Sequence, residues 1–191
     1  MELREVIKKR RSIRKFKDVS VAKERIEKLL KFAMWAPSGM NLQNWYFVVV
    51  TGNKKTKLVD IAKRAFDNYI SKSLEIVFKE HRSVIEDSKR FFYTLGNAPL
   101  VVCAYTEHTI EGELTDIQAV AAAIENFLLL LTEDGLGGCW MTGPVHLETE
   151  INKLLGVNDK KLQAVIPVGI PDISPPVPKR KEGKLKWIGW D

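Results

Sequence analysis

Five consecutive residues near the N-terminus, Arg10-Arg11-Ser12-Ile13-Arg14, combine three guanidinium groups with one hydroxyl. A guanidinium group can donate two parallel hydrogen bonds to phosphate oxygens, and a serine hydroxyl adds a short-range donor. This arginine segment (residues 10–14) is therefore a candidate phosphate site. The alternative is a basic helix end that faces solvent, which is the commoner role of such a run.

A second polar segment lies between a predicted helix and the apolar run Trp45–Val50, in the sequence Ala36-Pro37-Ser38-Gly39-Met40-Asn41-Leu42-Gln43-Asn44. Pro37 and Gly39 disfavour continuation of the helix. The hydroxyl and carboxamide side chains here are those of Ser38, Asn41, Gln43 and Asn44. Such groups both donate and accept, so together they can bind the edge of a flat heterocycle. A polar turn between a helix and a strand is the alternative for any one of them.

A third segment, Gly135-Leu136-Gly137-Gly138, precedes Cys139-Trp140-Met141-Thr142-Gly143-Pro144. Glycines let a backbone approach a planar ring closely and expose its amide donors. A glycine-rich helix end followed by a strand explains the same residues equally well.

In four blocks the chain resembles the nitroreductase family of FMN-dependent oxidoreductases: residues 10–16, 36–43, 135–141 and 178–181, in the family's order. Residues 61–96 match no family pattern. The resemblance implies an α+β, three-layer fold with a central, mostly antiparallel sheet flanked by helices. It also implies one domain over residues 1–191 and an intertwined homodimer, with residues 170–191 as an extended C-terminal arm.

The resemblance further implies which residues bind FMN. Those expected at its phosphate are Arg10, Arg11, Ser12, Arg14, Arg180 and Lys181, although a solvated basic turn is the alternative for the last two. Those expected at the ring edge, from the partner subunit, are Ser38, Asn41 and Gln43, and Pro37, Gly39 and Met40 of the same loop are also expected to bind the cofactor. Backbone groups of Met141, Thr142 and Gly143 are expected near the reactive nitrogen.

The implied activity is hydride transfer from NADH or NADPH to FMN, followed by reduction of a nitroaromatic, quinone or similar small-molecule acceptor in a ping-pong mechanism. The flavin carries this chemistry, so no catalytic side chain is required. The alternatives are a flavin-binding or sensory protein with little turnover, a dehalogenating or flavin-destroying relative, and a basic nucleic-acid-binding module. Without a Rossmann or Walker phosphate loop, the sequence does not distinguish NADH from NADPH.

Composition is that of a single compact domain: 191 residues, 45% hydrophobic and 28% charged, with a formal net charge of +6. The basic residues gather at 8–17 and 179–186. Because both clusters fall within or beside the family blocks, a phosphate site explains them at least as well as a nucleic-acid face, and we expect no nucleic-acid partner.

Cysteine and histidine positions indicate neither a disulfide nor a metal site. Cys103 and Cys139 are expected in the core, and His81, His108 and His146 are far apart in sequence. The charged N-terminus lacks the apolar core of a signal peptide, so we expect a cytoplasmic protein without a membrane partner.

Apolar periodicity predicts helices over residues 2–9, 20–36 with Ser20 as N-cap, 58–70, 73–93, 115–134 with Thr115 as N-cap, and 147–155 closed by Gly156. Strands are predicted at 45–50, 100–105 and 162–168, the first buried on both faces. The helix at 115–134 is apolar nearly all round, which favours a central core helix or a subunit interface over a membrane span. The aromatic tail at 185–190 is too apolar to remain in water and is expected to dock.

Overall fold

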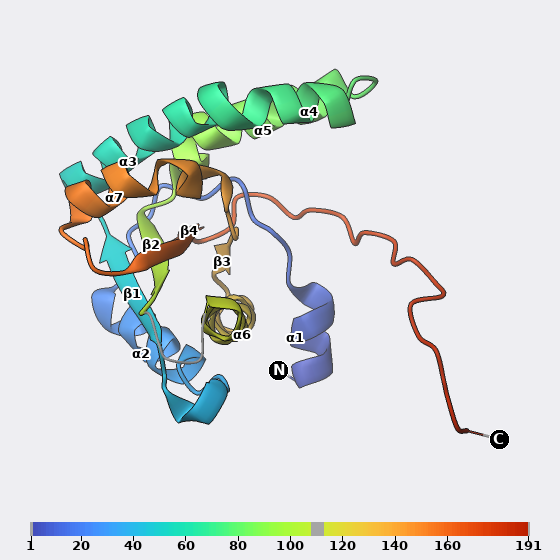
Figure 1. The fold of residues 1–191 in the computed structure, drawn as a ribbon. Helices are drawn as coiled ribbons and strands as arrows, with labels where there is room; N and C mark the ends of the chain where they lie inside the picture. The colour runs from blue at the N-terminus through green and yellow to red at the C-terminus, as the bar shows by residue number, and fades with distance from the viewer. Residues whose placement is uncertain (1, 108–112, 191) are drawn as a thin grey trace.

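A four-stranded antiparallel sheet with helices on both faces forms the body of the protein (Figure 1). The computed structural model describes residues 2–107 and 113–190. The strands are β1 (Trp45–Val50), β2 (Leu100–Thr106), β3 (Gly137–Gly138) and β4 (Lys161–Gly169), in the order β1-β2-β4-β3. The α+β, three-layer architecture implied by the sequence is confirmed.

The alternation of side chains along β2 shows why helices are needed on both faces of the sheet. Leu100, Val102 and Ala104 point to one apolar cluster, whereas Val101, Cys103 and Tyr105 point to the other. All of β2 is buried. A strand that is apolar on both faces must be covered on both, and this explains the unbroken hydrophobic run in the sequence.

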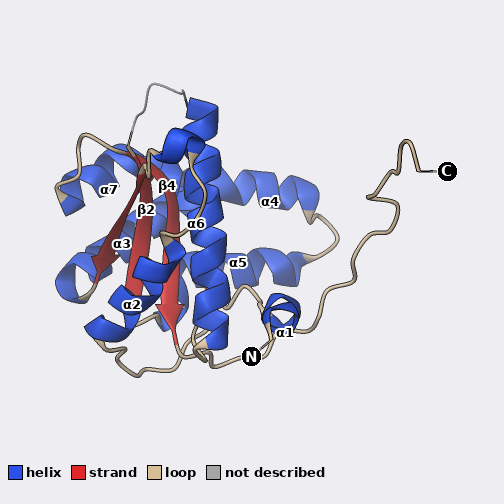
Figure 2. Ribbon diagram, turned by 90° about the horizontal axis from the view of Figure 1, so that it is seen from below, coloured by secondary structure: helices blue, strands red, loops and turns tan. Residues whose placement is uncertain are grey.

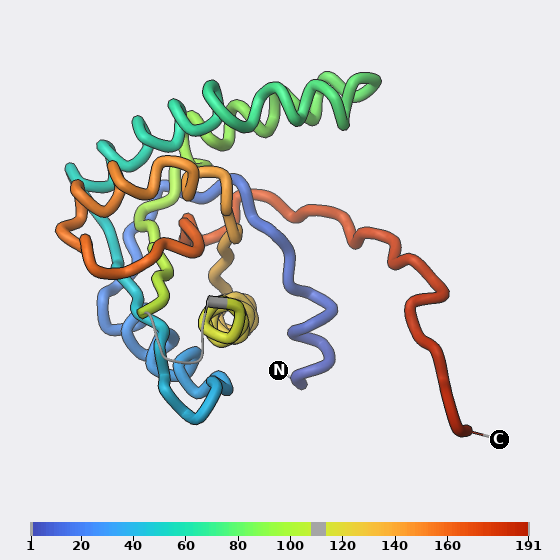
Figure 3. Tube along the Cα trace, viewed as in Figure 1, coloured from blue at the N-terminus to red at the C-terminus, as the bar shows by residue number. Residues whose placement is uncertain are grey.

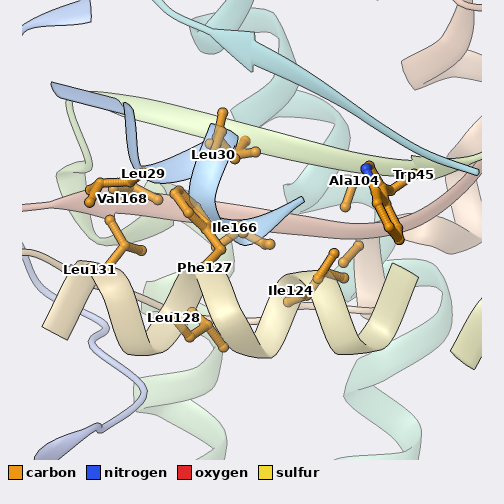
Figure 4. Close-up of a cluster of buried hydrophobic side chains, with 14 of the residues drawn as sticks. Leu29, Leu30, Trp45, Ala104, Ile124, Phe127, Leu128, Leu131, Ile166 and Val168 are labelled. Atoms are coloured by element: carbon orange, nitrogen blue, oxygen red, sulfur yellow. The ribbon is translucent and has the colours of Figure 1, made fainter. Parts of the chain in front are cut away.

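Helices α2 (Lys23–Ala33) and α6 (Glu113–Glu133) cover one face of the sheet. Ile124, Phe127 and Leu131 of α6 are fully buried against it, and Figure 4 shows them beside Leu29 and Leu30 of α2 and Ile166 and Val168 of β4. The short helix α1 (Leu3–Lys9) contacts α6 from the other side. By length and composition Leu114–Glu133 could span a membrane, with a mean hydropathy of 1.5, but here it is the core helix that the sequence predicts.

The opposite face is covered by α3 (Gly52–Ala65), α5 (Arg82–Thr94) and α7 (Glu148–Leu155), with the short helix η4 (Gly143–Leu147). A π-helical turn, η2 (Phe66–Ile70), carries α3 directly into α4 (Ser71–Val77). The predicted helix at 73–93 is therefore wrong, because the chain reverses at residues 78–81 and not near Ser71. Ser71 instead donates its hydroxyl to the carbonyl of Asp67 inside the helical run.

Three further local predictions are also wrong. Strand β1 is not buried on both faces, because within this chain it is an edge strand, and Tyr46 and Val49 are 41% and 44% exposed. Neither predicted N-cap is one: helix α2 begins at Lys23, three residues after Ser20, and Thr115 lies inside α6. The helix end at Gly156 is confirmed, with a left-handed φ of 76°.

From Asp172 to Trp190 the chain forms neither helix nor strand and runs away from the body (Figures 2 and 3). Its start is fixed, since Lys15 pairs with Asp172 at 2.8 Å and the Lys17 amide donates to the carbonyl of Ile170. Its end is not, because Trp187 and Trp190 are 69% and 77% exposed. The aromatic tail therefore does not dock on its own domain.

Gly96, in the short helix η3 (Leu95–Asn97), lies against the arginine segment and provides a test of how that segment is held. It has a φ of +65°, and an added Cβ would lie 2.5 Å from the carbonyl oxygen of Arg14. We expect Gly96→Ala to lower the free energy of unfolding by about 3 kcal/mol, because left-handed strain and backbone overpacking add. Gly156→Ala, at φ +76° with open space around the Cβ, should cost only about 1 kcal/mol. Equal losses in urea denaturation would contradict this packing.

Candidate functional site

The arginine segment runs extended along the sheet edge, beside the glycine segment (residues 135–138), which is more than a hundred residues away in sequence. The Ile13 amide donates to the carbonyl of Gly138 at 3.0 Å, and Ser12 forms a parallel bridge with Gly138. An added Cβ on Gly137 would lie 2.5 Å from the Ile13 side chain. Gly137 is therefore required for the arginine segment to lie this close to the sheet.

The arginine side chains are held by different partners. Arg10 Nε lies 3.3 Å from Oε1 of Glu125 on α6, and Arg14 stands over the ring of Phe91 at 5.9 Å. Arg11 Nη1 donates to the carbonyls of Lys8 and Arg10, each at 2.6 Å. Its Nε is buried without a hydrogen-bond partner among the residues that the structure describes. A buried donor that lacks an acceptor is costly, so an anion here would satisfy it.

The thiol of Cys139 lies in the electrostatic field of Arg10 and Arg14. Burial raises the pKa of its thiol, while Arg14, the Ser12 hydroxyl and Arg10 act in the opposite direction. Both cysteines are buried, as the sequence predicts. The arginine segment therefore directs positive charge onto the region beside β3.

A cleft of about 870 Å³ opens next to this segment. Ser12 and Arg14 form one wall, α4 and α5 a second, and the start of the arm a third; its apolar lining includes Leu74, Phe78, Phe91, Ile173 and Pro175. Figure 1 shows α4 and α5 projecting from the body above this part of the chain. Its volume falls within the usual range for small-molecule sites, about 300–1,000 Å³. The segment 61–96 thus supplies a wall of the cleft.

The polar loop (residues 38–43) has an unusual conformation, because Met40, Asn41 and Gln43 all have positive φ, at 45°, 56° and 52°. Each such non-glycine residue costs about 1–2 kcal/mol. Within the loop the Gln43 amide donates to Ser38 Oγ at 2.9 Å, and Gln43 Nε2 donates to Asn41 Oδ1 at 3.3 Å. Strain of this kind concentrates at functional sites and persists where surrounding structure fixes it.

Asn44 does not belong with the exposed polar side chains of the loop. It is buried and donates to Asp116 Oδ1 at 2.8 Å and to Thr106 Oγ1 at 3.2 Å. Sequence reasoning missed Asp116 and also Glu125, the partner of Arg10. Their only sequence signal is an acidic side chain within the otherwise apolar helix α6.

Figure 1 shows the polar loop, which includes η1 (Gly39–Asn41), and the arginine segment on opposite sides of α6. One chain therefore does not bring these two predicted groups together. Arg180 and Lys181 are exposed on the extended arm, beyond the ion pair that fixes its start.

Of the three backbone candidates, Met141 is already engaged, since its N–H and C=O both pair with Val165, at 3.1 and 2.9 Å. Thr142, which follows it, is exposed, whereas Gly143 is buried at the start of η4. An added Cβ on Gly143 would lie 2.6 Å from the Phe92 ring, so this glycine is needed where η4 meets α5. Of the three, Thr142 is the exposed one.

In residues 2–107 and 113–190 no group of three or more His, Cys, Asp or Glu side chains could hold a metal ion. His146 stacks on Tyr69 at 4.9 Å with an interplanar angle of 6°. His81 precedes α5, and His108 lies outside the described residues.

Comparison with known proteins identifies the family. The model of the nitroreductase family matches residues 7–170. The Bacillus subtilis (strain 168) protein YfhC, a candidate NAD(P)H nitroreductase, is 31% identical over 182 residues, covering 93% of this chain and 89% of its own. The iodotyrosine deiodinase of Thermotoga neapolitana is 30% identical over 187 residues, covering 94% of each.

Solved structures agree on the fold. A BluB-like flavoprotein from Clostridium difficile 630 has a TM-score of 0.77 at 29% identity, with 98% and 99% of the two chains covered. The FMN and NADPH-dependent nitroreductase NfnB from Sphigopyxis sp. strain HMH has a TM-score of 0.82 at 19% identity, with both chains fully covered. The family match over most of the chain and these relatives show that the protein belongs to the nitroreductase family.

Proposed function

We propose that this protein is an FMN-dependent oxidoreductase that takes hydride from NADH or NADPH and reduces a small organic acceptor, with residues 1–191 as one FMN-binding domain. The observation that carries the proposal is the arginine segment beside the cleft, in a nitroreductase-family chain, with the buried Nε of Arg11 in need of an acceptor. Flavoproteins and FMN- and NADPH-dependent enzymes among the solved relatives support this choice of cofactor.

The donor set suits the two ends of FMN. Arg10, Arg11, Ser12 and Arg14 offer charge-assisted hydrogen bonds to a phosphate dianion, with Arg180 and Lys181 of an arm as additional donors. Ser38, Asn41 and Gln43 suit the pyrimidine edge of the ring, where Pro37, Gly39 and Met40 shape the loop. When bound, FMN supplies the two-electron redox chemistry, and the protein supplies orientation and electrostatics. Donors at that edge stabilise negative charge as it develops there.

The cleft walls perform two further tasks. Phe91 and Phe78 exclude water beside Arg14, which strengthens electrostatic interactions there. Thr142 and Gly143 can present backbone amides toward the reacting edge of the ring. A donor nucleotide and an acceptor that use the same cleft in turn give ping-pong kinetics, with no side chain required for proton transfer.

The acceptor class has a second candidate. The deiodinase relative covers 94% of this chain at 30% identity, as closely related as the nitroreductase relative. Reductive dehalogenation of a halogenated aromatic substrate is therefore the alternative to nitro or quinone reduction. Halide release from a halophenol, measured beside reduction of a nitroaromatic, separates the two.

We propose a homodimer in which the polar loop of one subunit reaches the flavin of the other and the arm crosses between subunits. Exposed apolar side chains support it: Trp35 is 85% exposed and Met40 66%, and the arm carries Trp187 and Trp190. Large exposed apolar surfaces of this kind mark interaction sites.

Replacing Arg11 with Ala tests the phosphate assignment. We expect the Kd for FMN, measured by quenching of flavin fluorescence, to rise roughly tenfold to a hundredfold, because a hydrogen bond to a charged group contributes about 1.5–3 kcal/mol. Lys9→Ala, which removes an exposed charge at the end of α1, is the control and should change the Kd less than about threefold. Equal Kd values for the wild type and Arg11→Ala would contradict the assignment.

Sedimentation tests the dimer. We expect a species of twice the 21.7 kDa chain mass in the wild type. The double variant Trp187→Ser/Trp190→Ser should shift the equilibrium toward monomer, because it removes aromatic surface that the interface would bury. Ile76→Ser, at an equally exposed apolar position on α4, is the control and should leave the mass unchanged. A monomeric wild type at micromolar concentration would refute this assembly.

A further inference from the structure

Three polar residues from separate elements meet in the interior at one end of the sheet. Asn44 precedes β1, Thr106 ends β2 and Asp116 lies in the first turn of α6. Their exposed fractions are only 3%, 1% and 2%. Buried polar side chains are costly unless they are hydrogen-bonded, so this cluster must be organised by its mutual contacts.

Asn44 is fixed through both its side chain and its backbone. Its Nδ2 donates to Asp116 Oδ1 at 2.8 Å and to Thr106 Oγ1 at 3.2 Å, while its carbonyl accepts from the Glu107 amide at 2.8 Å. The Thr106 hydroxyl donates in turn to the Glu107 carbonyl. One carboxylate acceptor and one hydroxyl acceptor thus receive the carboxamide donors, which defines the orientation of Asn44.

The strained polar loop ends one residue before Asn44. Because Met40, Asn41 and Gln43 occupy the left-handed region, the loop keeps its shape only where the flanking chain is held. On the N-terminal side, the Ala36 amide donates to the Ala33 carbonyl at the end of α2. On the C-terminal side the contacts of Asn44 provide the anchor.

Helix α6 relates this anchor to the arginine segment. Asp116 and Glu125 are nine residues apart, which is about 14 Å along the helix axis. Asp116 holds Asn44, whereas Glu125 holds Arg10. The same rigid helix therefore sets the position of the polar loop and of the first phosphate-binding arginine.

We propose that Asn44 and Asp116 are positioning residues: this buried pair sets the shape of the polar loop, and through it the affinity and reduction potential of the flavin that the loop contacts. Both side chains are buried, so they would act on the flavin only through the loop. The effect on flavin affinity and potential rests on the proposed function, whereas the effect on the shape of the loop does not.

The test exchanges the two side chains. Asn44→Asp places a second carboxylate against Asp116 and removes the amide donor, so the loop should lose its anchor. The double variant Asn44→Asp/Asp116→Asn restores one carboxylate and one carboxamide with their places reversed, so the carboxamide at position 116 can donate to the carboxylate at position 44. Asn53→Asp, exposed at the start of α3, adds the same charge elsewhere and is the control.

Two measurements follow the loop and the flavin separately. Hydrogen exchange of the Gln43 amide, which donates to Ser38 Oγ, reports the loop in the protein without flavin. The Kd for FMN and the midpoint potential report the site. We expect Asn44→Asp to speed Gln43 exchange and weaken FMN binding roughly tenfold, with a shift in potential of about 30 mV for each tenfold difference in affinity between the two redox forms. The exchanged pair should return both towards wild type, and Arg11→Ala should weaken binding without accelerating Gln43 exchange.

Unchanged Gln43 exchange and FMN affinity in Asn44→Asp would overturn the proposal. An exchanged pair that regains the wild-type melting temperature but not the FMN affinity would also overturn it. If wild-type protein binds no FMN, the proposed function fails, but Gln43 exchange still tests the role of the pair in the loop. Faster exchange in Asn44→Asp that is reversed in the double variant supports that role. Unchanged exchange refutes it.

Discussion

The packing of α6 against the sheet is the interaction on which the rest of the structure depends. Phe127 and its apolar neighbours fix this helix on the sheet, and burial of each large apolar side chain stabilises the fold by about 1.5–3 kcal/mol. The polar contacts of the helix then hold Asn44, next to the polar loop, through Asp116, and hold Arg10 through Glu125. A core helix thereby also serves as the frame of the candidate site.

The two segments predicted to bind FMN lie on opposite sides of that frame, so one chain does not bring them together. A dimer in which each subunit donates its loop to the other resolves this, and it also covers the exposed aromatic residues. Under that arrangement FMN would bind only the assembled form. Flavin binding would then stabilise the dimer by mass action.

Much of this organisation is predictable from the sequence, because it depends on local residue types. The runs Leu100–Tyr105 in β2 and Ala164–Val168 in β4 are apolar, which indicates a sheet covered on both faces, and the arginine, polar and glycine segments are visible as motifs. The sequence does not predict contacts between residues that are far apart along the chain. Nothing near Asn44 distinguishes it from Asn41, because its acceptor Asp116 lies 72 residues further along the chain. The apolar sequence of β1 also overestimates its burial, since the position of a strand at the edge of a sheet depends on topology and not on composition. The helix start at Lys23 has no capping side chain, so Ser20 was a misleading signal.

An absorbance spectrum of the purified protein, incubated with FMN, desalted and then treated anaerobically with NADH or NADPH, shows whether the protein is a flavin-dependent oxidoreductase. We expect flavin to be retained in proportion to protein and its oxidised absorption to bleach with at least one nucleotide. Retained flavin that neither nucleotide bleaches would contradict the proposed oxidoreductase and favour a binding or sensory role. Loss of the flavin on desalting would contradict the FMN site itself.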